Sequence, residues 1–235
     1  MLIRLLCLLF LTSCATKYII PGNRFMTPET QGGAFRSSIE LHQSTANTLK
    51  ADVSEGDVEN GVEYSVGGRT GFAYAASFLE QVDLFWTHTG GGNSLLGAKY
   101  QFVGASKLAN GAGHKMAISA AMGGNEHESE GKPKVEFDLS GQEFQLLYGY
   151  RINEIVLLYS NFSYSRYNFE GEITSGDLKG LKPSFESKFY SLYAGMELAL
   201  GFFFVKGECG YQEMNTTDTK ANGNFLFGYA IGANF

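Results

Sequence analysis

The chain has four histidines, which are the side chains best suited to acid–base chemistry near neutral pH: His42, His88, His114 and His127. A hydrolytic site needs such a base beside a nucleophile and an orienting group. His88 stands in the segment WTHTGGGNS, where Thr89 and Gly90 follow it and no acidic residue adjoins it. The sequence by itself therefore assembles no catalytic group, and we interpret the histidines as solvated residues.

A second cluster of chemically active side chains is EHESEGK, residues 126–132, in which three glutamates surround His127. These residue types bind divalent cations, but a metal site also needs a fixed geometry. A polar segment of this kind is more typical of a solvated loop. We therefore predict no metal site and no cofactor.

Segments with a period of two must position these residues. The clearest is residues 144–150, where Phe144, Leu146, Tyr148 and Tyr150 alternate with Gln, Leu and Gly. Such alternation is typical of β-strands with one apolar face. Ten segments of the chain are predicted as strands on this basis: 34–43, 61–79, 81–88, 95–104, 115–123, 137–151, 155–166, 187–200, 201–212 and 224–235.

The composition indicates where such strands lie. Aromatic residues make up 14% of the chain, yet the mean hydropathy is only -0.11. After the first fourteen residues there is no apolar run of the roughly 18 residues that a membrane helix needs. A chain of this kind can cross a membrane only as a closed barrel of strands. The net charge of -6 argues against nucleic acid as a partner.

Connection lengths favour an up-and-down barrel. Long connections at 44–60, 124–136, 167–186 and 213–223 alternate with short turns near residues 80, 152–154 and 200–201. This is the pattern of bacterial outer-membrane barrels, with long external loops and short periplasmic turns. Residues 105–114 do not fit it, because a short turn is expected there. We predict an all-β fold, a single closed antiparallel barrel of about ten strands, with eight as the alternative.

The N-terminus MLIRLLCLLFLTSC has the basic start and apolar core of a secretory signal. Its end, Leu11-Thr12-Ser13-Cys14, resembles the lipobox of bacterial lipoproteins. The resemblance implies a signal peptide at 1–13 and a diacylglycerol on the Cys14 thiol. Ordinary cleavage after Ala15 is the alternative.

Residues 14–33 contain two of the four prolines and no clear period, so we expect a lipidated periplasmic tether before a barrel at 34–235. An even number of strands puts both ends of a barrel on one side, and we expect both termini in the periplasm. Cys209 is then the only free thiol, because Cys7 leaves with the signal, and we predict that it faces lipid.

The last strand, NFLFGYAIGANF, resembles the C-terminal signal of outer-membrane barrel proteins. That signal has a terminal Phe with apolar residues at alternate positions before it. Here the matching residues are Phe227, Tyr229, Ile231 and Phe235, with the small Ala233 at a position that is usually larger. The resemblance implies the barrel-assembly machinery as a partner during biogenesis, and outer-membrane lipid around the finished barrel.

The strand faces assigned to the lumen carry charges of both signs. We predict as lumen-lining Arg36, Glu40, Arg69, Asp83, Lys99, Lys115, Glu143, Arg151, Glu197, Lys206 and Glu208. A barrel of about ten strands is nearly filled by its own side chains. These charges are therefore expected to form an ion-paired plug, and a narrow path for solutes or ions is the alternative.

The function predicted from these features is structural, or an interaction at the cell surface through long acidic loops with an unidentified extracellular ligand. The alternative is a narrow pore for small solutes or ions. A third hypothesis is an outer-membrane enzyme that resembles either the lipid A deacylases, which use a His–Ser pair, or the omptin proteases, which use acidic residues with a histidine.

Overall fold

The computed structural model describes residues 15–20, 22–52, 63–90, 92–128, 134–175, 179–182, 184–216 and 219–235. All regular elements in these ranges are β-strands. None of the described residues belongs to a helix that is long and apolar enough to cross a membrane.

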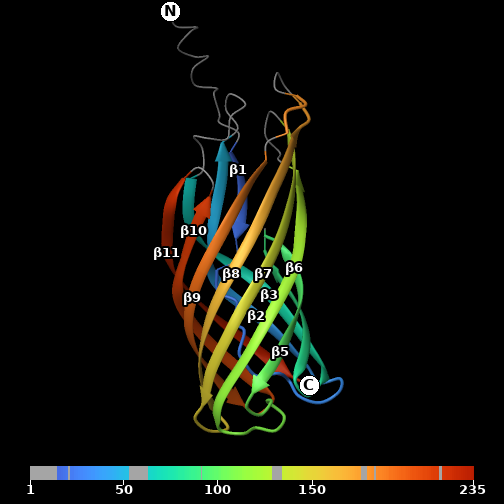
Figure 1. Ribbon diagram of the computed structural model, residues 1–235, viewed down its shortest axis with the longest axis vertical. Coiled ribbons are helices and arrows are strands. Elements are labelled where there is room, and N and C mark those ends of the chain that lie inside the picture. Colours follow the sequence, from blue (N-terminus) through green and yellow to red (C-terminus); the bar gives the residue numbers. More distant parts are fainter. Residues whose placement is uncertain are drawn as a thin grey trace, which may run out of the picture.

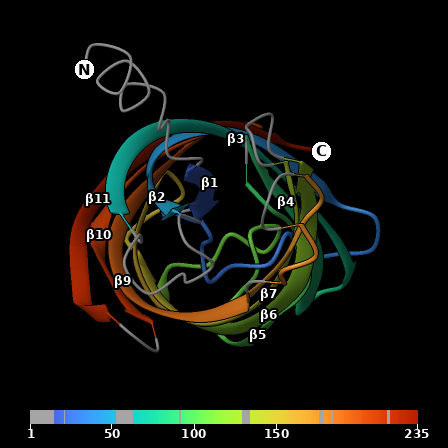
Figure 2. The same cartoon turned by 90° about the horizontal axis from the view of Figure 1, so that it is seen from above.

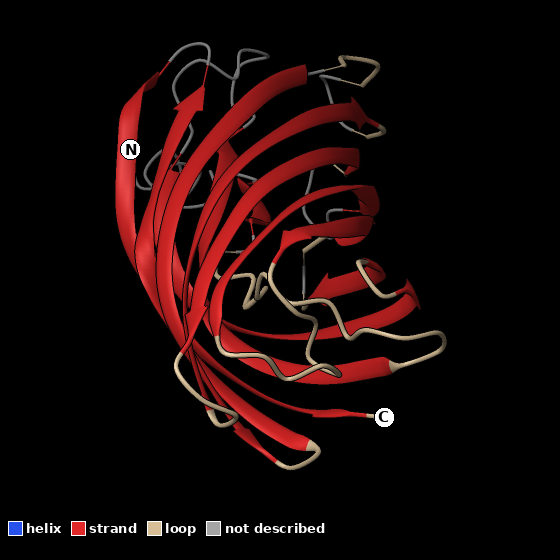
Figure 3. Cartoon of the chain, turned by 60° about the horizontal axis from the view of Figure 1, so that its bottom comes forward, coloured by secondary structure: helices blue, strands red, loops and turns tan. Residues whose placement is uncertain are grey.

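Eleven strands form one antiparallel sheet (Figure 1). Each strand from β2 to β11 pairs with the next along the chain, and β11 pairs back with β2, so ten strands close as a barrel (Figure 3). The predicted closed up-and-down barrel is thereby confirmed. The strand bounds are β1 Ala15–Ile20, β2 Ser37–Asp52, β3 Glu63–Leu79, β4 Val82–Thr89, β5 Ser94–Val103, β6 Gly113–Glu128, β7 Val135–Arg151, β8 Val156–Ile173, β9 Ser184–Leu200, β10 Phe203–Thr216 and β11 Thr219–Asn234.

Alternation along each strand separates an apolar outer face from a polar lumen. On β7, Phe144 and Leu146 are exposed, while the intervening Glu143, Gln145 and Leu147 are buried. The outer faces also carry exposed Trp86, Tyr100, Tyr148 and Tyr150. An apolar band outside a polar interior is the reverse of a soluble protein and is the arrangement of a barrel in lipid.

The strands are longer than the sequence predicted. β8 has 18 residues and reaches Ile173, although a strand needs only about 9–11 residues to cross a bilayer. Parts of the four predicted long loops, residues 44–52, 124–128, 167–173 and 213–216, are therefore strand. The remaining loop tips, such as 53–62 and 129–133, lie outside the described residues.

The polarity of the two faces reverses in these extensions. On β8, Asn168, Glu170 and Glu172 point outward, while Tyr167 and Phe169 are buried. We call the end of the barrel at the top of Figure 1 the upper end. The inner apolar residues form one cluster there: Ile20, Phe137, Leu139, Tyr167, Phe169, Ile173, Phe189 and Met214, with Phe185 packed against it. The upper extension thus has an apolar core and a polar exterior, as expected for a part of the barrel that projects into water.

The first described strand lies at an unexpected end of the barrel. Ala15 pairs with Asp52 at the upper end of β2, whereas Phe235 bonds to Ser37 at its lower end. β2 begins and β11 ends at the same lower end of the barrel, as an even number of strands requires. The expectation that both ends of the mature chain lie on one side does not hold for the described residues, because the segment before β2 returns through the lumen (Figure 2).

Candidate functional site: the occupied lumen

Residues 22–33, here called the plug, run through the barrel from the upper end to the lower. We expected them to be a free tether, and that interpretation is wrong, because Asn23, Phe25, Thr27, Glu29 and Thr30 are each at most 3% exposed. Figure 2 shows this segment inside the ring of strands. Small residues of the wall make the room: a Cβ on Gly228 would lie 2.5 Å from the Phe25 ring, and one on Gly149 would lie 2.8 Å from Pro28.

Side chains of the wall bind the plug backbone in its upper half. The Lys206 ammonium donates to the Phe25 carbonyl at 2.8 Å, and the Asn161 amide donates to the Met26 carbonyl at 2.8 Å. Phe25 has a φ of 53°, a conformation that is costly for a bulky residue. The contact with Lys206 and the packing against Gly228 hold this bend in place.

The lower half of the plug is bound in the same way. The Lys99 ammonium donates to the carbonyls of Thr27 and Glu29 at 3.2 and 2.5 Å. The backbone amide of Gln31 donates to both oxygens of Asp83 at 3.1 and 3.2 Å. Because buried backbone groups need partners, this pattern gives an irregular segment the bonds that a strand would receive from its neighbours.

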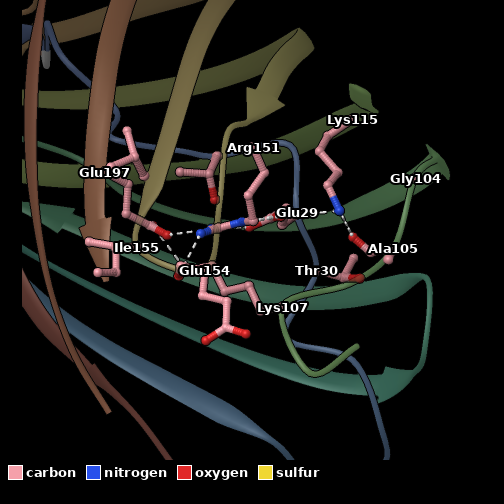
Figure 4. A network of polar contacts seen from close by, with 12 residues as sticks. Glu29, Thr30, Gly104, Ala105, Lys107, Lys115, Arg151, Glu154, Ile155 and Glu197 are labelled. Atoms are coloured by element: carbon pink, nitrogen blue, oxygen red, sulfur yellow. Dashed lines mark hydrogen bonds and ion pairs between the residues drawn. The ribbon is translucent and has the colours of Figure 1, made fainter. Parts of the chain in front are cut away.

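Glu29 is the centre of an ion-pair network at the lower end (Figure 4). Its carboxylate forms a two-point contact with the Arg151 guanidinium and lies 3.4 Å from the Lys115 ammonium. Arg151 also contacts Glu197 at 3.1 Å, and Lys107 contacts the same carboxylate at 3.0 Å. All five side chains are at most 12% exposed, so each charge depends on its partners and little on water.

A second ion pair fixes the upper part of the plug. The Arg24 guanidinium bonds both oxygens of Glu143, with the Nε atom 2.8 Å from each. Ser165 donates to the same carboxylate at 3.1 Å. The backbone amide of Arg24 donates to Glu208 at 3.2 Å. The plug therefore brings one cation and one anion to a wall that already carries the complementary charges.

The connection at 104–112 closes the lower end of the barrel. Its amides at Lys107 and Leu108 donate to the plug carbonyls of Thr30 and Gln31 at 2.9 and 3.3 Å. The Lys115 ammonium donates to the Ala105 carbonyl at 2.6 Å. This connection is longer than a simple turn because it folds against the plug, which explains the irregularity in the predicted loop lengths.

A cavity of about 50 Å³ lies between the plug and the wall formed by β2–β5. Its polar lining includes Arg24, Gln31, Glu40, Asp83, Lys99 and Lys206. This is more than the roughly 10–15 Å³ that one water molecule needs by the same measure, so water can occupy the space.

The predicted lumen-lining residues divide into three groups. Arg36 is exposed and lies just before β2, so its assignment to the lumen is wrong. Arg69 is partly buried on β3. The other residues are buried inside the barrel: Glu40, Asp83, Lys99, Lys115, Glu143, Arg151, Glu197, Lys206 and Glu208. Arg24 and Glu29 were not among the predicted lumen residues, because charged residues in a segment without a period give no signal of burial.

The three histidines whose side chains the structure describes, His42, His88 and His114, do not gather into one site. His42 was interpreted as solvated, and that interpretation is wrong, because it is buried on β2 with its ring 5.4 Å from that of Phe25. His114 bonds Tyr148 at 2.9 Å near the lower end. The His88 Nδ1 atom lies 3.0 Å from the Ser94 hydroxyl of the neighbouring strand. Ser94 comes from β5, where it lies opposite His88 in the pairing of β4 with β5.

The predicted assembly-signal residues Phe227, Tyr229, Ile231 and Phe235 are exposed on the outer face or end of β11. Cys209 is exposed on β10. Cys14, the predicted lipidation site, lies outside the described residues.

No protein-family model and no curated protein matches this chain. Three solved structures are similar to this chain, each with a TM-score under 0.5. The attachment invasion locus protein Ail of Yersinia pestis is 15% identical, with 86% of this chain and all of that chain covered and a TM-score of 0.43. The outer membrane protease OmpT of Escherichia coli is 11% identical, with 89% and 100% covered and a TM-score of 0.44. Neisserial surface protein A is 10% identical, with 88% and 100% covered and a TM-score of 0.40.

Proposed function

We propose that this protein is a bacterial outer-membrane barrel closed by its own N-terminal segment, with a structural or surface-interaction role carried by its upper end. The observation that carries this proposal is the plug, which is buried along its length and paired through Arg24 and Glu29. An occupied lumen leaves the upper strand extensions and their loops as the part of the molecule available to partners.

The outer surface supports the membrane assignment. The outward residues of β9 are apolar from Tyr190 to Leu200, and above them Lys188 and Glu186 are polar. A switch of this kind marks the edge of an apolar band, which is about 25 Å tall in outer-membrane barrels. The short connections lie at the lower end, which in this class of protein faces the periplasm.

In this orientation β1 lies at the outer face of the membrane. A diacylglycerol on Cys14, the residue before Ala15, would then meet the outer leaflet and not the inner one. We therefore propose that the plug carries the lipidated N-terminus through the barrel to the cell surface, and that the acidic extensions around it form the interaction surface.

Labelling of single cysteines on intact cells tests this topology. In a Cys209→Ser background, Lys182→Cys marks the upper end, Asn110→Cys marks the lower end, and Lys17→Cys marks β1. A membrane-impermeant maleimide should label positions 182 and 17 directly, but position 110 only after permeabilisation. Protection of position 17 with labelling at 182 would contradict the passage of the N-terminus through the barrel.

The second candidate function is an outer-membrane ester hydrolase, and the His88–Ser94 contact favours it. The two residues face each other across β4 and β5, on the outward face that also carries Trp86 and Leu96. A histidine bonded to a serine is the arrangement that activates a hydroxyl nucleophile. At the edge of the apolar band such a pair would meet lipid esters.

Release of fatty acid from phospholipid or lipopolysaccharide in mixed micelles tests this candidate. Activity that is lost in Ser94→Ala and in His88→Asn would support it. The control is Ser160→Ala, which changes an outward serine on another wall. Absence of release by the native protein, or equal release by all variants, would exclude this role for the pair.

A further inference from the structure

The seam that closes the barrel, the pairing of β2 with β11, has seven residue pairs, and below them Ser37 and Phe235 exchange backbone hydrogen bonds. Ser38–Ser44 of β2 face Gly228–Asn234 of β11. Above this stretch, the same edge of β2 is paired with β1, in the register Ala15↔Asp52 to Ile20↔Asn47. The other edge of β2 belongs to β3 up to Lys50. β1 therefore occupies the place in the sheet that the upper half of β11 would take in a fully closed barrel.

β2 and β11 separate at Thr45. Its hydroxyl accepts from the Phe227 amide at 2.9 Å and donates to the Phe227 carbonyl at 3.2 Å. A side chain thus replaces the backbone pair that the register predicts at this position. Just above Thr45, the side-chain amide of Asn224 donates to the side-chain oxygen of Asn47 at 2.9 Å, again without a backbone pair between β2 and β11.

The N-terminal segment enters the sheet at the point of separation. A Cβ on Gly22 would lie 2.5 Å from the Thr45 carbonyl and 2.6 Å from the Leu226 side chain. Only glycine fits here without displacing one side of the seam, because the plug passes between β2 and β11. Leu226 and Ala46 are both fully buried around this passage.

β11 is long enough to compete for the same edge. Ser44 faces Gly228, so the continued register puts Asn47 opposite Phe225 and Asp52 opposite Lys220. β11 begins at Thr219 and therefore covers this whole stretch. Within the described residues, β11 pairs above Gly228 with β10 and with no second strand.

Sequence explains which strand occupies the edge. β1 ends in Tyr18-Ile19-Ile20, residue types that favour strands. The corresponding positions of β11 are Gly223-Asn224-Phe225, and Asn and Gly are depleted in strands.

We propose that the upper edge of β2, Asn47–Asp52, is a strand-binding site for an extended peptide, with β1 and the upper half of β11 as alternative occupants. With β1 bound, the seam is split above Thr45 and the N-terminal segment lies in the split. With β1 released, β11 zips onto β2 and closes the barrel wall. The exchange gives the N-terminal segment a lateral way into and out of the barrel, and it does not depend on lipidation of Cys14.

Two disulfide pairs that share one residue distinguish the two states in the full-length chain. Lys17 and Lys50 are partners in the β1 state, and the continued register makes Lys50 and Asn222 partners in the zipped state. Lys17→Cys/Lys50→Cys and Lys50→Cys/Asn222→Cys are each built in a Cys209→Ser background. Linked peptides are identified by mass after mild oxidation. Tyr18→Pro/Ile19→Pro is then added to the second pair, because proline cannot donate to a strand partner.

The 17–50 link should form readily with β1 intact, and the 50–222 link should be rare. The proline variant should raise the 50–222 link by about tenfold or more, because a disrupted strand no longer holds the edge. Heat-modifiable migration in gels verifies that the barrel is folded. A folded proline variant without increased 50–222 linkage overturns the proposal. If the double variant does not fold, Thr16→Pro at the far end of β1 is used in its place. It should also raise the yield of the 50–222 link, and an unchanged yield overturns the proposal equally.

Discussion

Replacing Glu29 by Gln removes the carboxylate that the plug presents to Arg151 and Lys115 at the lower end of the lumen. The substitution keeps the shape of the side chain but replaces one acceptor oxygen by an NH2 donor, which faces the donors of Arg151 and Lys115. It leaves two buried cations with one fewer anion, while the apolar outer face and the strand register are unchanged. The effect therefore falls on the attachment of the plug to the wall.

The magnitude follows from the burial of the pair. Breaking a buried ion pair by removing one partner costs about 3–5 kcal/mol. Arg151 keeps its contact with Glu197 at 3.1 Å, and Lys115 keeps the Ala105 carbonyl at 2.6 Å, so the lower figure applies. About 3 kcal/mol corresponds to roughly a 100-fold change in the equilibrium between inserted and released plug.

Conductance of the full-length protein in planar bilayers measures this equilibrium. We expect the native protein to be closed almost all the time, and the Glu29→Gln variant to spend roughly 100 times more of the recording in a conducting state. The matched control is Glu172→Gln, which removes a carboxylate from an exposed pair with Lys182 at 3.2 Å. Exposed pairs contribute about 0–1 kcal/mol, so this variant should behave as the native protein does.

Equal conductance of the Glu29 and Glu172 variants would refute the claim that buried ion pairs hold the plug. Steady conductance of the native protein would refute the plug itself as a barrier, and would favour the narrow pore that the sequence left open as an alternative.

Three further predictions test the faces of the wall, the closing strand and the seam. Leu146→Arg should reduce the yield of assembled barrel through a cost of about 2–4 kcal/mol for a cation in mid-bilayer lipid, whereas Gln142→Arg, above the apolar band on the same face of β7, should assemble normally; equal yields would mean that the faces are misassigned. Deletion of Phe235 should leave the chain protease-sensitive in membrane fractions, and normal heat-modifiable barrel would contradict an assembly role for the terminal residue. Gly22→Ala should lower the thermal midpoint of the plugged barrel, because the added methyl would lie 2.5 Å from the Thr45 carbonyl, and an unchanged midpoint would mean that the split seam has more room than the structure gives it.

The sequence determined the barrel because alternation is a local property. Phe144, Leu146 and Tyr148 share one face of β7 whatever the rest of the chain does, and Glu143 must then point the other way. The same parity assigned Lys99, Arg151 and Lys206 to the interior. The alternation wrongly assigned Arg36 to the lumen, because Arg36 precedes the first paired residue of β2, Ser37, and alternation applies only within a strand.

Strand ends were less predictable because the polarity of the faces reverses above the apolar band. Tyr167 and Phe169 face inward while Asn168 and Glu170 face outward. The period of two therefore continues, but the apolar residues now lie on the inner face. Because the pattern expected of a lipid-facing strand stops at the band, the sequence predicts a strand end at 166 and a loop beyond it.

Only the tertiary structure decided what fills the lumen. The partners of the plug lie far away in sequence, as with Glu29 and Arg151 or Arg24 and Glu143, which are separated by 122 and 119 positions. A segment without a period shows no sign of such contacts, since its bonds run to side chains of the wall and not to a neighbouring strand. The sequence therefore determined a barrel with a charged interior. The tertiary structure determined that this interior binds the chain's own N-terminal segment. The physical reason is that Arg24 and Glu29 can be buried only where the wall supplies their counter-charges.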